Sequence, residues 1–243
     1  MNLKLTLKYD GTEYHGWQVQ PNGITVQEVL EKTLSSLAGE KISVTGCSRT
    51  DAGVHAAMHV SNFKMDTSIP VRKIPLVLNQ KLPDDIRAVC CEEVDETFNA
   101  RFDTKEKTYR YRILNAEHND PFLSRFVWHY PIALDVEKMK KAAGYMVGEK
   151  DFTAFMASGS SAKTTVRNLK RVEVEKNGDV ITITATANGF LYNMVRIIVG
   201  TLVYVGNGKL SCEEVKNILQ TKDRRLGGVT APPQGLILEE VVY

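Results

Sequence analysis

The first hundred residues switch between two spacings of hydrophobic positions. Residues 3–9 place a hydrophobic side chain at every second position, which predicts a half-buried strand. From Thr25 to Gly39 the hydrophobic positions follow helical spacing, and Thr25 with Glu28 forms a capping box at the start. Three further strands and one short helix are expected, over 42–45, 58–63 and 86–94 and near 75–81. The resulting order, β-α-β-β-α-β, resembles a ferredoxin-like unit with mainly antiparallel strands.

The rest of the chain repeats this mixture of strands and helices. Residues 105–114 alternate, and Asn177-Gly178 predicts a hairpin between two later strands, 166–174 and 180–187. Helices are expected after Asp135, over 190–205 and after Ser211, with a strand over 236–243. We therefore predict an α+β protein with two ferredoxin-like α+β halves, residues 1–103 and 104–243.

Composition narrows the class of protein only a little. The 243 residues are 43% hydrophobic and 25% charged, which is typical of a globular protein. A net charge of +2 says little about partners, so any affinity for nucleic acid must come from local clusters of cations. Residues 1–5 alternate like a strand, and the longest hydrophobic run, 197–205, is too short to cross a bilayer. We expect a cytoplasmic protein without a membrane segment.

Neither a metal site nor a cofactor site is expected. The four cysteines have no zinc-like spacing, and we expect them all to be reduced: Cys47, Cys90, Cys91 and Cys212. His55 and His59 are four residues apart, but a two-histidine site needs a helix and the flanking residues predict a strand. No phosphate-binding loop, dinucleotide fingerprint or nucleophile elbow is present.

Asp51 is the first candidate for chemistry. It lies in the loop 47–56, between two predicted strands, with Arg49 two residues before it. Gly53 allows a sharp turn there because it has no Cβ. The alternative is an ordinary Asp-Gly turn, in which the carboxylate bonds only its own backbone.

Arg196 is the second candidate, since it interrupts the hydrophobic helix predicted over 190–205. A buried guanidinium needs a partner, because an unpaired buried charge is costly. It therefore pairs with a carboxylate in a cleft, for which Asp51 is the candidate, or else it reaches the surface or forms a purely structural ion pair.

The third candidate is the strand 105–112, in which aromatic and basic residues alternate. Tyr109 offers a ring on which a base can stack, and Arg110 offers charge for phosphates, although a solvated edge strand can look the same. Other loop cations could line a groove for a nucleic-acid backbone: Arg49, Arg101, Lys163 and Arg167.

A single loop carboxylate without a cofactor suits substitution at a sugar C1′. Ordinary glycosidases need two carboxyl groups, and no convincing second one is found. An isomerisation, in which the base is detached and rejoined, fits better than hydrolysis. The alternatives are a nucleoside or glycoside hydrolase and a non-catalytic RNA-binding protein.

Several short motifs together resemble one family. They are Tyr9-Asp10-Gly11-Thr12, Gly16-Trp17-Gln18, Val26-Gln27, Ser48-Arg49-Thr50-Asp51-Ala52-Gly53-Val54-His55, Ala100-Arg101-Phe102, Thr108-Tyr109-Arg110-Tyr111, Phe152-Thr153, Gly189-Phe190-Leu191-Tyr192-Asn193-Met194-Val195-Arg196 and Thr230-Ala231-Pro232. In order and identity they are similar to the tRNA pseudouridine synthase A (TruA) family over essentially the whole chain. Ser48 departs from the glycine that the family often has, at a position outside the reacting group.

The resemblance implies a cofactor-free isomerase that converts uridine to pseudouridine in the anticodon stem-loop of tRNA, at positions 38, 39 and 40. It also implies the pseudouridine synthase fold, a central RNA-binding cleft and a homodimer. By position, Asp51 matches the catalytic aspartate, Tyr109 the active-site tyrosine and Arg196 the basic partner of the aspartate. Tyr109 and four further residues are expected to bind substrate: Arg49, His55, Arg101 and Arg110.

Overall fold

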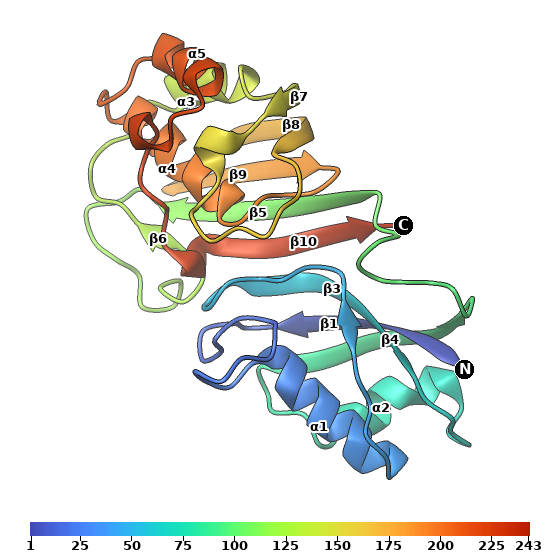
Figure 1. Ribbon diagram of the computed structural model, residues 1–243. Helices are drawn as coiled ribbons and strands as arrows, with labels where there is room; N and C mark the ends of the chain where they lie inside the picture. The colour runs from blue at the N-terminus through green and yellow to red at the C-terminus, as the bar shows by residue number, and fades with distance from the viewer. The chain divides into compact units, whose positions relative to one another are not determined.

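The computed structural model describes residues 1–243 and divides into two compact units. Unit 1 contains Met1–Lys105 and Ile237–Tyr243, and unit 2 contains Glu106–Leu236. Figure 1 labels the elements of both. Strands and helices are mixed in each unit and most strand pairs are antiparallel, so the predicted α+β class is confirmed.

Unit 1 is a sheet with two helices on one side of it (Figure 1). Its elements are β1 (Asn2–Tyr9), α1 (Val26–Ala38), β2 (Thr45–Gly46), β3 (His55–Lys64), α2 (Ile74–Asn79), β4 (Ile86–Val94) and β10 (Leu236–Val242), with a 3-10 turn at Val71–Lys73. Strand β1 lies between β3 and β4, antiparallel to both. The predicted order β-α-β-β-α-β over the first hundred residues is confirmed.

Burial explains why this unit folds around β1. Leu3, Leu5 and Leu7 are completely buried, as their alternation predicted. The buried stripe of α1 consists of Val26, Leu30 and Leu34. Thr25 caps this helix by accepting a hydrogen bond from the Glu28 amide, and Gly39 ends it in the left-handed conformation, with φ +75°.

The prediction of a strand over 42–45 is wrong except at its last residue, Thr45. Regular pairing starts only at Thr45, where β2 pairs with β3. Before it, side chains of α1 take up the backbone groups: Glu31 accepts from the Val44 amide and Ser35 from the Ile42 amide, both at 2.9 Å. Side-chain partners thus replace the ladder that hydrophobicity alone predicted.

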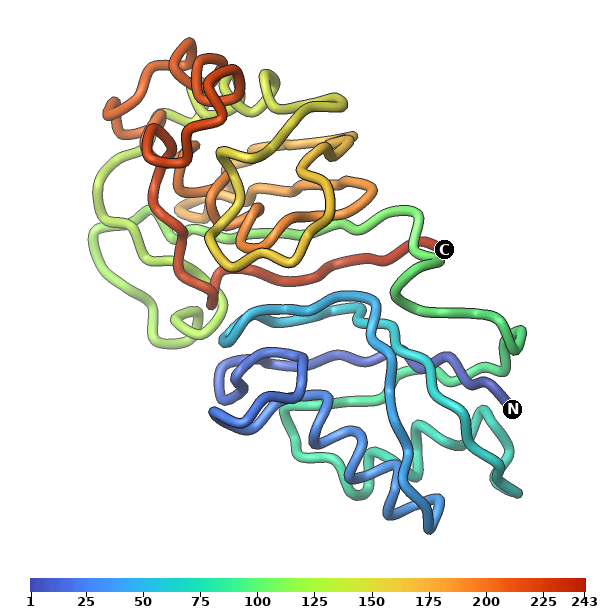
Figure 2. Tube along the Cα trace, in the orientation of Figure 1, coloured from blue at the N-terminus to red at the C-terminus, as the bar shows by residue number.

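Strand β10 returns to unit 1 after the whole of unit 2. It runs parallel to the start of β3, with Ile237 opposite His55 and Leu238 opposite Ala56. Figure 2 shows it as the red segment. Tyr243 then packs against Phe98, with ring centroids 5.0 Å apart, and donates its hydroxyl to the Ala100 carbonyl at 2.8 Å. The expected halves 1–103 and 104–243 differ from the observed units here, because pairing to β3 draws this segment away from its neighbours in sequence.

In unit 2, antiparallel strands pair in the order β5-β9-β8-β7. Its elements are β5 (Glu106–Leu114), β6 (Trp128–His129), α3 (Val136–Gly144), β7 (Gly148–Asp151), β8 (Val166–Asn177), β9 (Val180–Ala187), α4 (Met194–Gly206) and α5 (Cys212–Thr221). The hairpin predicted at Asn177-Gly178 is confirmed, and Asp135 and Ser211 cap α3 and α5 as predicted. Helix α3 packs against α4 and β8.

Helix α4 is the buried helix that the sequence predicted. Every residue in it except Arg196 and Tyr204 is buried. It begins at Met194, however, four residues later than predicted. The reason is that Asn193 adopts a left-handed conformation, with φ +59° and ψ +8°, which cannot continue a right-handed helix backwards.

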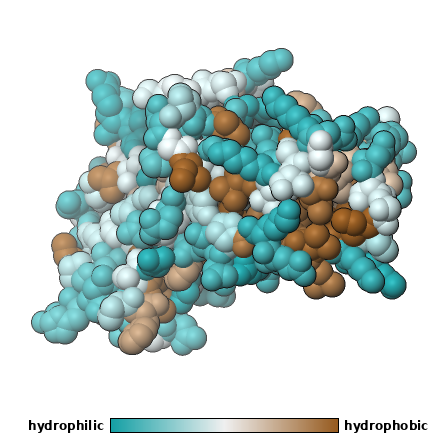
Figure 3. All heavy atoms as spheres, turned by 90° about the horizontal axis from the view of Figure 1, so that it is seen from below, coloured by the Kyte–Doolittle hydropathy of each residue, from teal (hydrophilic) through white to brown (hydrophobic).

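In Figure 3 the hydrophobic residues form separate brown groups among hydrophilic ones on the face shown. No helix has the length and hydrophobicity needed to span a membrane.

Candidate active site

Asp51 lies in a tight turn that leads directly into β3. The turn is closed by the Val54 amide, which donates to the Asp51 carbonyl at 3.1 Å. Gly53 adopts φ +76°, so the predicted role of this glycine in a sharp turn is confirmed. Asp51 is partly exposed, whereas Thr50 and Val54 beside it are buried. The turn therefore has a buried frame and a carboxylate near its surface.

Residues from the N-terminal motif hold this turn on one side. The Trp17 amide donates to the Thr50 carbonyl at 3.0 Å, and the Gly53 amide donates to the Tyr14 carbonyl at 3.2 Å. Below them, the Tyr9 hydroxyl and Thr50 Oγ1 are 2.7 Å apart in a buried hydrogen bond. These bonds flank Asp51 on both sides, so its backbone has little freedom to move.

Two glycines allow the N-terminal loop to approach the turn closely. A Cβ on Gly11 would lie 2.0 Å from the Val54 carbonyl oxygen. A Cβ on Gly16, which has φ +84°, would lie 2.5 Å from the Thr50 carbonyl oxygen. The segment Tyr9–Gln18 therefore packs directly against the backbone of the Asp51 turn and limits the shapes that the turn can adopt.

Buried aromatic and imidazole rings support the same loop. Trp17 stacks on His59 with ring centroids 3.6 Å apart and 23° between the planes. His59 Nε2 is 3.0 Å from the Ser48 carbonyl, which fits a ring protonated on Nε2. The strand β3 that carries His59 therefore connects to the start of the Asp51 loop.

His55 is buried, with 2% of its surface exposed. Its Nδ1 accepts from the Gly11 amide at 3.0 Å. Asp10 Oδ1 also lies 3.0 Å from Nδ1, and this carboxylate accepts from the Thr12 amide at 3.0 Å. These contacts brace the loop, and the RNA contact expected for His55 stays a prediction.

Arg49 and Arg101 are both exposed, as contacts to a phosphate backbone require. The Arg101 guanidinium lies over the ring of Phe102, 5.3 Å from its centroid. Phe102 is itself 74% exposed. Asn99 Oδ1 fixes this loop by accepting from the amides of both residues. The loop therefore presents an ordered cation and ring to solvent.

Tyr109 comes from β5 in unit 2 and is almost fully buried, with 6% exposed. Its ring meets Phe190 edge to face, with centroids 5.2 Å apart. This packing fixes the direction of the ring. Arg110 follows on the opposite face of the strand and is partly exposed.

Arg196 stands in the first turn of α4, and its guanidinium has two acceptors within unit 2. Nε donates to the Ala231 carbonyl and Nη1 donates to Asn193 Oδ1, both at 2.7 Å. The Ala231 amide in turn donates to the Arg196 carbonyl at 3.0 Å. The sequence singled out Arg196 but did not show what orients it.

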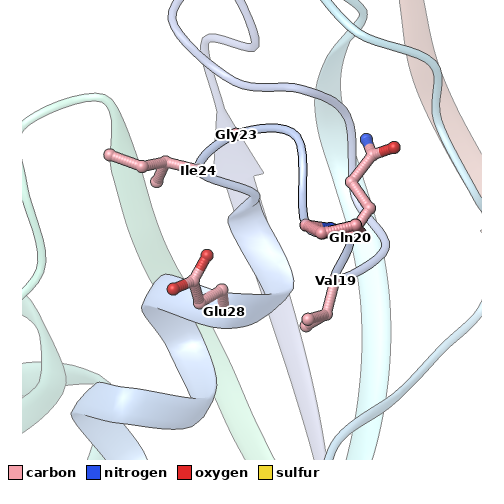
Figure 4. A pocket seen from close by; sticks show the side chains of 6 residues that line it. Val19, Gln20, Gly23, Ile24 and Glu28 are labelled. Atoms are coloured by element: carbon pink, nitrogen blue, oxygen red, sulfur yellow. The ribbon is translucent and has the colours of Figure 1, made fainter.

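Unit 1 has a hollow of about 510 Å³ that is lined by residues between Val19 and Glu28, and Asp51 is not among them. Figure 4 shows Glu28 on the first turn of α1 and the other labelled residues in the loop before it, where the Gln20 side chain points away from Glu28. Two of its hydrophobic members, Val19 and Ile24, are exposed. No three His, Cys, Asp or Glu side chains gather as a metal site would require.

Comparison with known proteins agrees with the resemblance seen in the motifs. The family model described as tRNA pseudouridine synthase matches residues 6–103 and 142–243. The chain belongs to the tRNA pseudouridine synthase family. Chemically, it is an isomerase.

Relatives named tRNA pseudouridine synthase A match over the full length. The protein from Thermoanaerobacter sp. (strain X514) is 52% identical over 242 residues, covering 100% of this chain and 99% of that protein. Those from Ruminiclostridium cellulolyticum and Clostridium acetobutylicum are 50% and 48% identical, with 99% and 100% of this chain covered and 99% of each relative.

Several residues that shape this pseudouridine synthase had no role assigned from the sequence. Tyr9 and Trp17 stood in recognised motifs, but only the structure connects them to Thr50. The left-handed backbone of Asn193 was not predicted, because this residue lies within the expected helix. The residue type alone could have indicated it, since Asn tolerates the left-handed conformation better than most residues.

Proposed function

We propose that this pseudouridine synthase isomerises uridine in the anticodon stem-loop of tRNA, at positions 38, 39 and 40. The observation that carries the proposal is the full-length similarity to proteins named tRNA pseudouridine synthase A. The held turn around Asp51 adds support, because a reacting carboxylate needs a fixed position. A cytoplasmic location follows from the tRNA substrate, and we propose a homodimer from the family resemblance.

The reaction rearranges bonds within one nucleotide. The N1–C1′ bond of uridine breaks, a C5–C1′ bond forms, the C5 proton leaves and N1 gains a proton, so atoms and charge balance without a cofactor. A uridine inside a stem must first be extruded, at a cost of a few kcal/mol. Exposed Arg49 is two residues from Asp51 and suits contact with the displaced nucleotide or its neighbours.

Asp51 acts at the ribose, by attack on C1′ or by removal of a ribose proton. Tyr109 stacks on the extruded uracil, and its hydroxyl assists loss of the C5 proton. Arg196 pairs with Asp51 in this proposal, which lowers the pKa of the carboxyl and keeps it ionised. The fixed direction of the guanidinium within unit 2 suits such a pairing.

The direct test replaces Asp51 with Asn. The variant should form no pseudouridine on unmodified tRNA while binding that tRNA normally. Asp84→Asn is the matched control, because Asp84 is a fully exposed carboxylate of the same unit, and it should turn over normally.

Four outcomes would contradict parts of the proposal. Normal turnover by Asp51→Asn would refute the role of the aspartate. Release of free uracil by the unmodified protein would indicate a hydrolase, and binding of tRNA without any product would indicate a non-catalytic RNA-binding protein. Modification outside positions 38, 39 and 40 would refute the site preference alone.

A further inference from the structure

Helix α4 fixes the backbone of Arg196, but a long flexible side chain needs further contacts to fix its end. Those contacts come from Asn193 Oδ1 and the Ala231 carbonyl, each 2.7 Å from a guanidinium nitrogen. The guanidinium is planar and carries five N–H donors in a rigid fork. Two acceptors on different nitrogens therefore define the plane of the group as well as its position.

Asn193 departs from the usual behaviour of a residue at the start of a helix. Such a residue is normally extended, and its side chain accepts a hydrogen bond from an amide in the first turn. Asn193 is left-handed instead, with φ +59°, and its side chain makes no capping bond. Its Oδ1 accepts from Arg196, one turn along. An uncommon backbone conformation thus places the amide oxygen beneath the guanidinium.

The second acceptor is held as firmly as the first. The segment 228–232 crosses α4 so closely that a Cβ on Gly200 would lie 1.8 Å from the Val229 carbonyl oxygen. The Gly228 amide donates to Thr201 Oγ1 at 3.0 Å, and the Tyr111 hydroxyl donates to the Pro232 carbonyl at 2.7 Å. Ala231 lies between these anchors and is completely buried.

We infer that Asn193 is a positioning residue, which sets the plane of the Arg196 guanidinium against the rigid Ala231 carbonyl. The inference rests on the proposed role of Arg196. Asn193 itself touches neither uracil nor ribose in this account. Its loss should slow the chemical step and leave tRNA affinity unchanged.

The test compares two variants that keep the backbone conformation. In Asn193→Gly the glycine adopts φ +59° without steric cost, but the acceptor oxygen is lost. Asn193→Asp keeps an acceptor oxygen at this position. A misplacement of about 1 Å can cost on the order of 100-fold in rate. We expect Asn193→Gly to lower the single-turnover rate of pseudouridine formation about 10- to 100-fold, with the Kd for tRNA changed less than about twofold. Asn193→Asp should recover most of the rate.

A matched control is available in the same unit. Lys222 is the other non-glycine residue with positive φ, at +58°. It follows the last residue of α5 and lies 26 positions after Arg196 in the sequence. Lys222→Gly should leave the rate unchanged. Asn193→Gly should also have no further effect in an Arg196→Lys background, because its action passes through the arginine.

Three results would overturn the inference. The first is a full rate for Asn193→Gly, and the second is an equal loss of rate and of melting temperature in both Asn193 variants. The third is a further, additive loss of rate when Asn193→Gly is combined with Arg196→Lys. Failure of the underlying proposal looks different, since Arg196→Lys would then itself turn over at the full rate. If Asn193→Gly is too unstable to assay, Asn193→Ala takes its place, because it also removes the acceptor, and a full rate for that variant would overturn the inference.

Discussion

The hydroxyl of Tyr9 lies 2.7 Å from Oγ1 of Thr50, and both side chains are buried. This bond joins β1, the central strand of unit 1, to the residue immediately before Asp51. Tyr9→Phe keeps the ring but leaves Thr50 without this partner, so the free energy of unfolding should fall by about 1–2 kcal/mol. Because the Asp51 turn loosens, we also expect turnover to fall about tenfold, which a pseudouridine assay and denaturant unfolding would measure.

A double-mutant cycle checks that this effect depends on the hydrogen bond. Thr50→Val removes the other partner, so the two changes together should cost less than the sum of the single changes. Additive losses would show that Tyr9 acts through another contact.

Gly16 should be irreplaceable for steric reasons, and Gly39 provides the control. Both have positive φ, +84° and +75°, so an alanine at either position pays about 1–2 kcal/mol for a left-handed backbone. Only at Gly16 does the added Cβ meet the Thr50 carbonyl, at 2.5 Å, whereas nothing lies within 4 Å at Gly39. Gly16→Ala should therefore cost roughly 1–3 kcal/mol more and lower turnover more than tenfold. Equal effects of the two substitutions on turnover would refute the close fit of loop and turn.

Asp151 should make unit 2 sensitive to acid. Lys222 Nζ lies 2.8 Å from its carboxylate, and Thr153 donates to it at 2.6 Å, so the pKa of Asp151 is well below its ordinary value of 3.8. A carboxyl with a lowered folded-state pKa stabilises the fold above its unfolded pKa and loses that contribution as the pH falls through the folded value.

Asp151→Asn should accordingly lower the free energy of unfolding at pH 7 by about 1 kcal/mol, since the pair is partly exposed to solvent. The difference from the unmodified protein should stay constant down to about pH 4 and shrink at lower pH. Unfolding curves between pH 7 and pH 3 would measure it, and a difference that grows on acidification would contradict the lowered pKa.

Arg101 should contribute to the affinity for tRNA through phosphate. If tRNA binds through phosphate contacts, the logarithm of the association constant should fall linearly with the logarithm of the salt concentration. Arg101→Ala should reduce the size of that slope by roughly one, while Lys140→Ala, on the solvent side of α3 and paired with Glu137, should not change it. An unchanged slope for Arg101→Ala would remove this residue from the RNA contacts.

The local rules of the sequence predicted most of the elements correctly. The caps at Thr25, Asp135 and Ser211 and the hairpin at Asn177-Gly178 depend on neighbouring residues alone, so short motifs suffice to find them. Asp51 could likewise be placed in a turn because Gly53 follows it.

The errors and omissions have a common physical cause, namely hydrogen bonds to particular partners that hydrophobic spacing does not record. Residues 42–44 look like a strand but bond to side chains of α1, and β10 pairs with a strand some 180 positions earlier, Ile237 opposite His55. The start of α4 was misplaced because Asn193 bonds Arg196 through an uncommon backbone conformation. Hydrophobic spacing carries no record of such partners.

The pairing of β10 with β3 bears on how the protein is made. During synthesis, at about 5–20 residues per second, the first hundred residues leave the ribosome well before Ile237–Tyr243 exists. The edge at the start of β3, opposite Ile237 and Leu238 in the finished protein, stays unpaired until the whole of unit 2 has been translated. A nascent chain stalled before Ile237 should therefore be a good client for chaperones, and a premature stop there should harm the beginning of the protein more than its middle.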